Sequence, residues 1–342
     1  MAKFYDITTW TEKPFLNTKG TRDKCIVVNP ADDCNYYFKT SIKKEDKDYK
    51  SEFWSEIIAS EIGRKLGFNV LEYNIALHND KVGCISKSMT TEAEYLLEGI
   101  NILTGYDNTY KPDDKKSYSE YTFQFIENAL NSFNLSNGII HIIETIVFDA
   151  LIGNSDRHQE NWGFIVPYKK NDITETDRNS LLRKLIQRIK NIKANKVNSQ
   201  LVTKEGIIID VEGEYAPIYD SGCCLAREKT DPAVKQMLKD EMMLNSFINR
   251  GKSEIRWTNN GEKLNHFELI GKIKEKHKEI VDKTIERTIK QYNADIVKQI
   301  VTDIDKELPN DLKDLFGLSE DRKQLICKLI DKRISKLKEV LS

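Results

Sequence analysis

The sequence run Ile139-Ile-His-Ile-Ile-Glu-Thr-Ile-Val-Phe-Asp-Ala-Leu-Ile-Gly-Asn-Ser-Asp-Arg-His-Gln-Glu-Asn-Trp-Gly163 places a polar loop directly behind a strongly apolar segment. Apolar residues recur on every side of residues 139–152, which predicts a helix buried at the centre of the fold. The loop that follows contains Asp156 and Asn161. Packing gives no reason for a carboxylate and a carboxamide at this spacing in a tight polar loop, so we interpret the pair as functional.

The spacing of these two residues has a specific chemical precedent. In the catalytic loop of protein kinases, Asp-x-x-x-x-Asn supplies an aspartate that accepts or orients the substrate hydroxyl proton and an asparagine that binds magnesium. A further candidate ligand, Asp220, opens the tripeptide Asp220-Ser-Gly222 behind a predicted strand. Kinases hold a metal-binding Asp-x-Gly at this topological position. Since magnesium prefers hard oxygen ligands, Asn161 and Asp220 form a suitable pair.

Two upstream residues extend the pattern toward nucleotide phosphates. Lys39 lies on a predicted strand and Glu56 on the helix that follows, as in the lysine–glutamate ion pair of kinases. The polar segment 17–24 contains one glycine, Gly20, and could cover phosphates with backbone N–H groups. It matches neither a Walker A sequence nor a full G-x-G-x-x-G. Each residue alone has an ordinary structural explanation, and only their order along the chain indicates a kinase-like site.

The predicted elements divide the chain into two lobes. Strands are expected at 24–29, 35–40, 70–77 and 82–87, with a helix at 51–66. Residues 95–118 are expected to form mostly loop, and later strands are expected at 162–166, 206–211 and 215–219. One apolar helical face runs over 280–304, and Ser319 is expected to cap a final helix. We therefore predict an α+β fold with a strand-rich N-terminal lobe (residues 1–90) and a larger helical C-terminal lobe (residues 91–342).

Composition excludes several classes of protein. The 342 residues include 53 Lys or Arg and 54 Asp or Glu, so the chain is not a globally basic nucleic-acid coat. No apolar run approaches the ~20 residues of a membrane span, and the N-terminus lacks the apolar core of a signal peptide. The six cysteines form no Cys-x-x-Cys pair and the histidines are scattered, which favours reduced thiols in a cytoplasm. Secretion by a signal-independent route would leave no readable trace.

A basic segment separates the two metal motifs. Residues 167–206 contain ten Lys or Arg and four Asp or Glu. We interpret the segment as a solvated helical insertion, and the alternative is a docking surface for an acidic partner such as tRNA, a tRNA-bound enzyme or a membrane surface. Among the residues beside the motifs, Arg157 is expected to bridge a nearby carboxylate and Trp162 to lie in the core. Cys223 and Cys224 are interpreted as inert.

These motifs together resemble the HipA-like serine/threonine kinases, especially the compact CtkA-type members. The resemblance rests mainly on Asn154-Ser-Asp-Arg-His-Gln-Glu-Asn-Trp-Gly-Phe164 and Ala216-Pro-Ile-Tyr-Asp-Ser-Gly222, and more loosely on Tyr36-Tyr-Phe-Lys39, Ser55-Glu56 and Gly67-Phe-Asn-Val70. It implies a two-lobed kinase fold, the use of ATP and Mg²⁺, and a protein serine or threonine as the acceptor. The activity that the resemblance implies is transfer of the γ-phosphate of ATP to a protein hydroxyl, together with autophosphorylation.

The resemblance also implies a role for each matching residue. Asp156 would be the general base, while Asn161 and Asp220 would bind magnesium. The residues implied to bind the nucleotide are Lys39 with its partner Glu56, His158 and Tyr219, the phosphate loop Gly20, Thr21, Arg22, Asp23 and Lys24, and the adenine hinge Lys87, Ser88 and Met89. Thr18 and Thr21 are the candidate autophosphorylation sites.

The expected partners follow from the same resemblance. A protein substrate is expected, with a translation-related factor as one candidate, and direct DNA binding is not expected. An antitoxin is a further candidate partner. HipA toxins carry an additional subdomain ahead of the phosphate loop, and Lys39 lies too early in this chain for one, so docking of an antitoxin in the usual way is not expected. Two other functions stay open, namely a lipid or small-molecule kinase related to phosphatidylinositol kinases and a catalytically silent pseudokinase that binds ATP.

Overall fold

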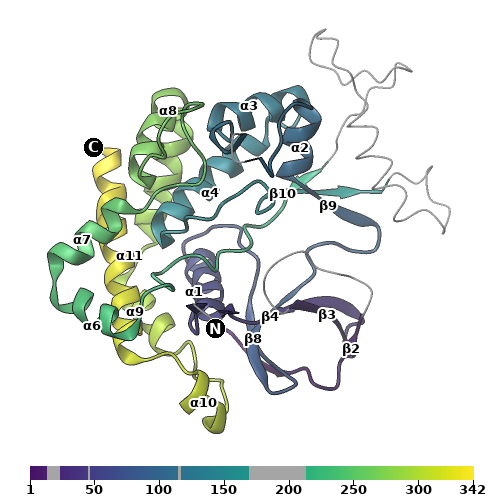
Figure 1. The fold of residues 1–342 in the computed structure, drawn as a ribbon, viewed down its shortest axis with the longest axis vertical. Coiled ribbons are helices and arrows are strands. Elements are labelled where there is room, and N and C mark those ends of the chain that lie inside the picture. Colours follow the sequence, from purple (N-terminus) through teal and green to yellow (C-terminus); the bar gives the residue numbers. More distant parts are fainter. Residues whose placement is uncertain (14–23, 45–46, 115–116, 169–212) are drawn as a thin grey trace.

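A curled sheet forms the strand-rich part of the computed structural model, which describes residues 1–13, 24–44, 47–114, 117–168 and 213–342 (Figure 1). The sheet has six strands in the order β1-β7-β8-β4-β3-β2. Their bounds are β1 Phe4–Asp6, β2 Thr11–Glu12, β3 Lys24–Asn29, β4 Cys34–Lys39, β7 Asn74–His78 and β8 Lys81–Lys87. The short strands β5 (Lys43–Lys44) and β6 (Lys47–Asp48) pair with each other beside it.

The two faces of this sheet bury different clusters because strand side chains alternate between faces. One face packs on helix α1 (Glu52–Lys65) and contributes residues such as Ile75 and Cys84 to the main core. The opposite face holds a small separate core that includes Val27, Phe38 and Ile85. Lys39 follows Phe38 in β4, so its side chain points to the α1 face. This alternation is what brings the lysine to the helix that carries Glu56.

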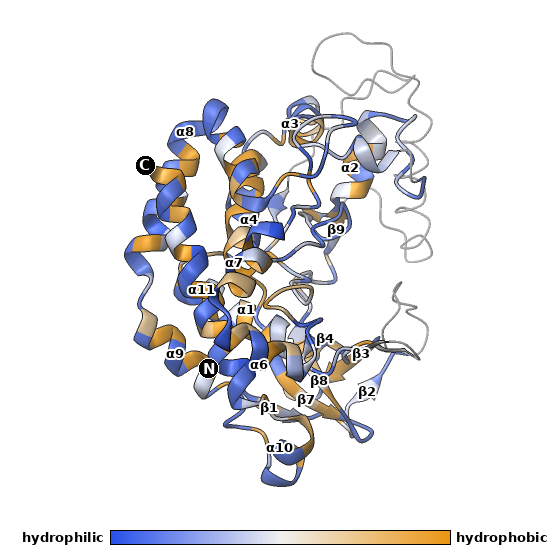
Figure 2. Cartoon of the chain, turned by 60° about the vertical axis from the view of Figure 1, so that its left-hand side comes forward, coloured by the Kyte–Doolittle hydropathy of each residue, from blue (hydrophilic) through white to orange (hydrophobic). Residues whose placement is uncertain are grey.

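The helical part is arranged around α4 (Gly138–Ile152), the helix predicted to be buried at 139–152. Most of α4 is buried, and α8 (His266–Gln291) and α11 (Glu320–Leu341) both pack against it. Figure 2 shows the apolar residues of α8 and α11 turned inward and their polar residues outward. The remaining helices are α2 Gly99–Tyr106, α3 Phe123–Ser132, α6 Asp231–Lys239, α7 Glu241–Arg250, α9 Ala294–Thr302 and α10 Asn310–Phe316, with a 3-10 turn at Ser117–Ser119.

Helix α1 also contacts the helical part. Its Trp54 is buried and donates its indole N–H to the Phe316 carbonyl oxygen, at 2.7 Å between nitrogen and oxygen. Helix α1 packs on α9 as well. The helix that carries Glu56 is therefore fixed to both parts of the molecule, and the division at residue 90 remains a prediction.

Several predicted strands differ from those observed. Strands β3, β4 and β8 confirm the expected positions to within one residue. The expected strand 70–77 begins only at Asn74, because Val70 instead forms an isolated bridge with Ile218. The expected strand 215–219 is reduced to that bridge and to β11 (Glu214–Tyr215). Pro217 lies between the two and lacks the N–H that a continuous ladder needs.

The prediction of a mostly loop segment at 95–118 is wrong. Strand β9 (Glu94–Glu98) and helix α2 occupy its first half. Strand β9 pairs antiparallel with β10 (Gly163–Pro167) to form a three-stranded sheet with β11. The partner strand lies more than sixty residues away in sequence, so local composition could not reveal the pairing.

The apolar face predicted over 280–304 is interrupted. Helix α8 ends at Gln291, and the side chain of Asn293 accepts hydrogen bonds from the backbone N–H groups of Asp295 and Ile296, which starts α9. Ser319 occupies the N-cap position of α11 as predicted, but its side chain accepts no capping hydrogen bond. The expected strand 206–211 and almost all of the basic segment 167–206 lie outside the described residues.

Among the residues that the structure describes, no helix is both long enough and apolar enough to cross a membrane.

Candidate active site

The polar loop behind α4, residues 153–162, is held in shape by its own amide side chains. Gly153 ends α4 in the left-handed conformation, with φ of +71°. The side chain of Asn154 donates to Asp149 Oδ1 at 2.9 Å, and its carbonyl oxygen accepts from the Asp156 backbone N–H at 3.3 Å. Asn161 Nδ2 donates to the Asp156 backbone oxygen at 2.8 Å. This last hydrogen bond joins the two ends of the segment 156–161 and keeps Asp156 and Asn161 close together.

Arg157 fixes this loop to its surroundings, as the sequence predicted. It is 1% exposed and forms a bidentate ion pair with Asp149 on α4, at 2.8 and 2.9 Å. Its Nη1 also donates to the backbone oxygens of Asn161 and Tyr219, at 2.8 and 2.5 Å. Burial alone would lower the pKa of Arg157, but the Asp149 carboxylate raises it above its ordinary value. The guanidinium therefore joins α4, the loop and the segment that leads to Asp220.

Lys39, Glu56 and Asp220 meet between the sheet and this loop. Lys39 Nζ donates to Glu56 Oε1 and, at 3.2 Å, to Asp220 Oδ1. The side chain of Lys39 is 12% exposed and that of Glu56 is 1% exposed. Burial alone would lower the pKa of Lys39, yet the carboxylates of Asp220 and Glu56 raise it well above its ordinary value. A permanently charged lysine is thus held between two carboxylates from distant parts of the chain.

The Asp220-Ser-Gly222 tripeptide is shaped by contacts with Glu56 and Tyr73. Glu56 Oε2 accepts a hydrogen bond from the Ser221 backbone N–H at 2.9 Å. Asp220 has a φ of +52°, which is unusual for a residue with a side chain, and its N–H donates to the Tyr73 hydroxyl at 3.3 Å. A Cβ atom on Gly222 would lie 2.9 Å from Glu56 Oε1. Glu56 therefore positions both the lysine and the Asp-x-Gly turn.

Asn161 and Asp220 offer the oxygen ligands that a magnesium ion would need. Asn161 uses its amide nitrogen for the Asp156 carbonyl, and no hydrogen bond within the described part of the chain occupies its amide oxygen. Asp220 contributes a carboxylate whose side chain is 28% exposed. Carboxylate and amide oxygens suit magnesium, which keeps several waters. The donor chemistry of these two residues therefore fits the metal that the sequence motifs imply.

Cys223 and Arg227 contact the site in ways that the sequence did not predict. Cys223 Sγ donates to Asp156 Oδ2 at 3.2 Å, so the cysteine interpreted as inert is in direct contact with the candidate base. Arg227 contacts Cys223 Sγ at 2.9 Å and forms an ion pair with Glu52 at 2.8 Å. Neither residue belongs to a recognisable spacing pattern, because turns 222–229 bring them to the site.

The other predicted nucleotide-binding residues are placed less centrally. His158 Nδ1 accepts from the Glu160 N–H at 3.3 Å, and the Tyr219 hydroxyl donates to the Glu160 carbonyl at 2.8 Å. Burial raises the pKa of Tyr219 well above its ordinary value. Lys24 lies opposite Lys39 in the β3–β4 register.

The structure describes the predicted hinge residues but not most of the predicted phosphate loop. Lys87 is exposed at the end of β8 and pairs with Asp32 at 2.9 Å, while Ser88 Oγ donates to the Thr90 carbonyl. Met89 is partly buried. The structure does not bring Lys87 into contact with Lys39 or Glu56. Of the predicted site residues, five lie outside the described ranges, namely Thr18, Gly20, Thr21, Arg22 and Asp23.

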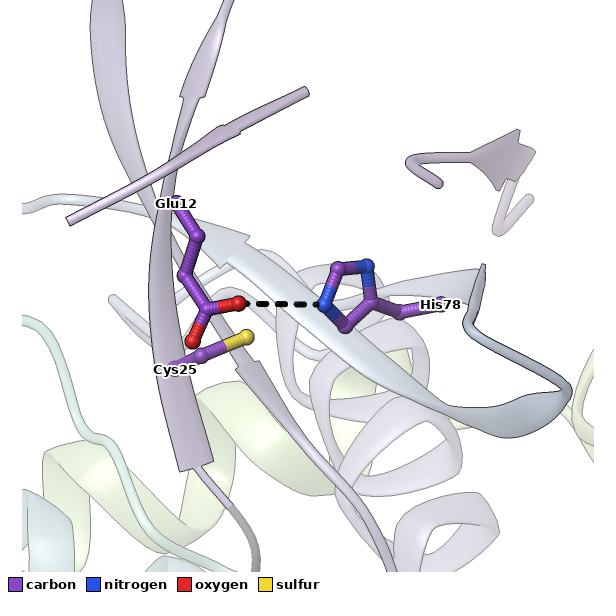
Figure 3. A group of neighbouring side chains, drawn as sticks. All are labelled: Glu12, Cys25 and His78. Carbon is purple, nitrogen blue, oxygen red and sulfur yellow. Dashed lines mark ion pairs between the residues drawn. The ribbon is translucent and has the colours of Figure 1, made fainter. Parts of the chain in front are cut away.

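A second group of ligand-type side chains lies on the other face of the sheet (Figure 3). Glu12, Cys25 and His78 offer ligand atoms that all lie within 4.8 Å of one another, and Glu12 pairs with His78 Nε2 at 3.6 Å. Metal-bound histidines normally donate their other ring N–H to a partner, whereas His78 Nδ1 is buried with no hydrogen-bond partner among the described residues. Burial and the Glu12 charge raise the pKa of Cys25 to about 11, which keeps the thiol protonated. We interpret this group as an ion pair that ties β2 to β7.

Comparisons with known proteins agree with the geometry. No protein-family model matches the chain. The serine/threonine-protein kinase CtkA of Helicobacter pylori is 23% identical over 265 residues, which cover 76% of this chain and 66% of that kinase. The match thus spans slightly less than two thirds of the kinase. The crystal structure of CtkA, described as a proinflammatory kinase, superposes with a TM-score of 0.69 at 20% identity, over 98% of this chain and 96% of that one.

A second solved structure is HipA of Shewanella oneidensis MR-1, in a complex with HipB and operator DNA. It superposes with a TM-score of 0.48 at 12% identity, over 98% of this chain and 67% of that one.

Fold and motifs together define a protein with the two-lobed α+β architecture of the kinase-like folds. Within that class, the chain is similar to the serine/threonine-protein kinase CtkA, which agrees with the resemblance of its motifs to the HipA-like kinases of CtkA type.

Proposed function

We propose that this protein is an ATP- and Mg²⁺-dependent serine/threonine protein kinase of the HipA-like type. The observation that carries the proposal is the convergence of Lys39, Glu56 and Asp220 beside the loop that holds Asp156 and Asn161. These five residues come from four separate segments of the sequence, and each has the chemistry that phosphoryl transfer requires at its place. The similarity to CtkA supports the same function.

Each side chain has a distinct role in this proposal. Lys39, held by Glu56, binds phosphate oxygens as a fixed cation. Asp220 and Asn161 hold magnesium, which would neutralise the charge of the transferred phosphoryl group. Asp156 accepts or orients the proton of the acceptor hydroxyl. Because these groups are held by buried contacts, catalysis would come from positioning and electrostatics rather than from a covalent intermediate.

The proposal is tested by transfer of labelled phosphate from ATP to a general protein acceptor such as casein. Asp156→Asn should lower the rate by about 10²–10⁴-fold, because the proton acceptor is lost while the side-chain shape is kept. Asp33→Asn makes the same chemical change in the exposed turn between β3 and β4 and should leave the rate unchanged. Equal rates for wild type and Asp156→Asn would contradict the proposed role.

The other two functions predict different results in the same assay. Phosphorylation of phosphoinositide vesicles without protein phosphorylation would favour a lipid kinase. Thermal stabilisation by Mg²⁺-ATP without transfer to any acceptor would favour a pseudokinase. The intact set of charged residues in the site supports an active kinase over a pseudokinase, and the similarity to the serine/threonine-protein kinase CtkA supports a protein acceptor over a lipid.

Autophosphorylation at Thr18 or Thr21 is a further part of the proposal. It rests on the resemblance to HipA-like kinases, in which the enzyme can phosphorylate its own phosphate loop. Peptide mapping after incubation with Mg²⁺-ATP should find phosphate on one of these threonines in the wild type and on neither in Thr18→Ala/Thr21→Ala. Phosphate found only elsewhere in the chain would contradict this assignment. An acceptor from the translation machinery and an antitoxin partner remain expectations from the same resemblance.

A further inference from the structure

A cavity of about 780 Å³ opens beside Asp156, on the side formed by α6, α7 and α11. The residues that line it are Gly153, Ser155, Cys223, Ala226, Glu228, Lys229, Met237, Met243, Ser246, Phe247, Arg250, Gly251, Lys252, Lys263 and Arg333. None of the residues that hold Lys39 or the Asp220 turn is among them. The cavity is therefore separate from the proposed nucleotide site.

Two residues that line the cavity, Ser155 and Cys223, lie next to Asp156. Ser155 is exposed and precedes Asp156 in the loop. Cys223 contacts Asp156 Oδ2 at 3.2 Å. A chain lying in the cavity could therefore present a hydroxyl group to the Asp156 carboxylate, which is the position that an acceptor must take in phosphoryl transfer.

The charge of the lining is strongly basic. It includes five Lys or Arg side chains and one acidic residue, Glu228. Lys229 pairs with Glu228 at 3.4 Å, and Lys263 is paired with Glu254 at 2.5 Å. By contrast, the residues Arg250, Lys252 and Arg333 form no ion pair within the described part of the chain. These three cations give the cavity a positive potential although the whole chain has a net charge of −1.

Arg333 is the most informative of the three. Its side chain is 2% exposed, and its Nη1 donates to the Ala150 carbonyl oxygen near the end of α4 at 2.8 Å. This bond accounts for one of five N–H groups, and no carboxylate of the described residues balances the charge. Burial lowers the pKa of Arg333 to about 10. An unbalanced buried cation is unfavourable in the free protein, so an anionic ligand would relieve it.

The same cavity also offers apolar contact. Met237 is buried, while Met243 and Phe247 are partly buried in its wall. Lys229 Nζ lies 4.8 Å from the centre of the Phe247 ring. An apolar wall next to cations suits a polypeptide that carries both apolar and acidic side chains better than it suits a bare phosphate backbone.

We propose that this cavity binds the acceptor segment of a protein substrate in which the target serine or threonine is flanked by acidic side chains. The inference rests on the proposed kinase function, because it uses Asp156 as the point where the acceptor hydroxyl lies. Arg250, Lys252 and Arg333 would contact the acidic side chains, and the two methionines with Phe247 would contact an apolar neighbour. The cavity thereby selects the substrate by charge as well as by the hydroxyl group.

The test is a binding measurement that does not depend on catalysis. Short fluorescent peptides carry alanine at the acceptor position and either glutamate or glutamine on both sides, and fluorescence anisotropy measures their affinity for Asp156→Asn. The glutamate peptide should bind at least about tenfold more tightly, and the difference should shrink as salt is raised. Equal affinities would overturn the proposal.

A matched pair of double variants localises the effect. Arg250→Gln/Lys252→Gln removes two exposed charges of the lining and should abolish most of the preference for glutamate. Lys290→Gln/Lys298→Gln removes two exposed charges on α8 and α9, outside the lining, and should keep the preference. Equal losses in both variants would mean that only net charge matters and would overturn the proposal. Tighter binding of single-stranded RNA than of the glutamate peptide would also overturn it.

The outcome is separable from that of the kinase assignment. If the wild type phosphorylates glutamate-flanked and glutamine-flanked serine peptides with equal kcat/KM, the acidic preference is wrong and the kinase assignment stands. If no peptide is phosphorylated but the glutamate peptide binds selectively through Arg250 and Lys252, the kinase assignment fails and the acidic binding site stands.

Discussion

At the scale of single residues, Lys39 is held by two carboxylates from distant parts of the chain. It is the last residue of β4, directly after the buried Phe38, and its ammonium group lies between Glu56 and Asp220. Neither contact helps the sheet to form, since both partners lie on other elements. The two carboxylates hold the cation at one point, which is what phosphate binding requires.

Lys39→Met should therefore impair catalysis far more than folding. We expect kcat/KM for ATP to fall by about 10²-fold or more, because a fixed cation at the phosphates is lost. The control Lys65→Met removes an exposed lysine at the end of α1 and should change neither activity nor stability. An unchanged kcat/KM in a folded Lys39→Met protein would remove this lysine from the proposed site.

Gly222 provides a second test at this scale. A methyl group there would lie 2.9 Å from Glu56 Oε1, so Gly222→Ala should displace the glutamate that positions both Lys39 and the Ser221 N–H. We expect loss of activity and a destabilisation of roughly 1–3 kcal/mol, as for overpacked cores.

Gly271→Ala is the matched control for Gly222→Ala. Gly271 lies in α8, and a Cβ atom there meets nothing within 4 Å. Alanine is favoured over glycine in helices by about 1 kcal/mol, so the melting temperature of Gly271→Ala should stay the same or rise. The two variants can be compared by thermal unfolding and by the phosphate transfer assay. Equal activity in both would show that the contact between Gly222 and Glu56 has no functional role.

At the scale of elements, the packing of α8 against α11 encloses a neutral histidine. His266 begins α8, is 1% exposed and has no hydrogen-bond partner for either ring nitrogen in the described part of the chain. Burial and the nearby charge of Arg333 lower its pKa from 6.5 to about 3. The unfolded chain therefore binds a proton at this residue in a range where the folded chain does not.

The sign of the resulting pH dependence follows directly. Above about pH 6.5 the histidine is neutral in both states and has no effect, whereas below it the unfolded state gains a proton that the folded state lacks. Stability should then fall as the pH is lowered from 6.5 toward 3, by roughly 2 kcal/mol at pH 5 from this group.

Denaturant unfolding at pH 7 and pH 5 measures this effect. His266→Phe keeps a ring of similar size without a titrating group and should lose most of the extra destabilisation at pH 5. His141→Gln replaces a histidine whose side chain is 42% exposed, and this variant should show the same extra destabilisation at pH 5 as the wild type. The same pH dependence in wild type and His266→Phe would contradict the assignment.

The elements also show what the sequence could and could not predict. The buried α4, the strands β3 and β4 and the helix α1 were predictable because their apolar patterns are local and periodic. Strand β9 was missed because it depends on pairing with β10, which is distant in sequence. The break between α8 and α9 was missed because one asparagine side chain, Asn293, ends a continuous apolar face.

The same distinction holds for the candidate site. Lys39, Glu56, Asp156, Asn161 and Asp220 were predictable from their order and from motif spacing. The positions of Cys223 and Arg227 were not, because turns rather than periodic elements place them. The cavity charge was not predictable either, since Arg333 on α11 joins Arg250 and Lys252, at the end of α7 and just after it, only in the folded chain.

At the scale of the whole molecule, the site depends on contacts between the strand-rich and helical parts. Helix α1 carries Glu56 and is fixed to the helical part through Trp54 and Phe316. Leu71 and Ile218 connect the chain after α1 to the segment that leads to Asp220, through a backbone hydrogen bond of 2.9 Å. The lysine of the sheet and the aspartate of the helical part are thus held at one place by the fold as a whole.

The central claim is that these two parts together form a phosphotransferase site. Intact-mass spectrometry of the dephosphorylated protein, before and after incubation with Mg²⁺-ATP and casein, tests it most directly. The account predicts gains of about 80 Da per phosphoryl group on the chain or on casein for the wild type and for Asp33→Asn, and none for Asp156→Asn. Gains of equal size with Asp156→Asn, or no gain on either protein with the wild type, would contradict the account.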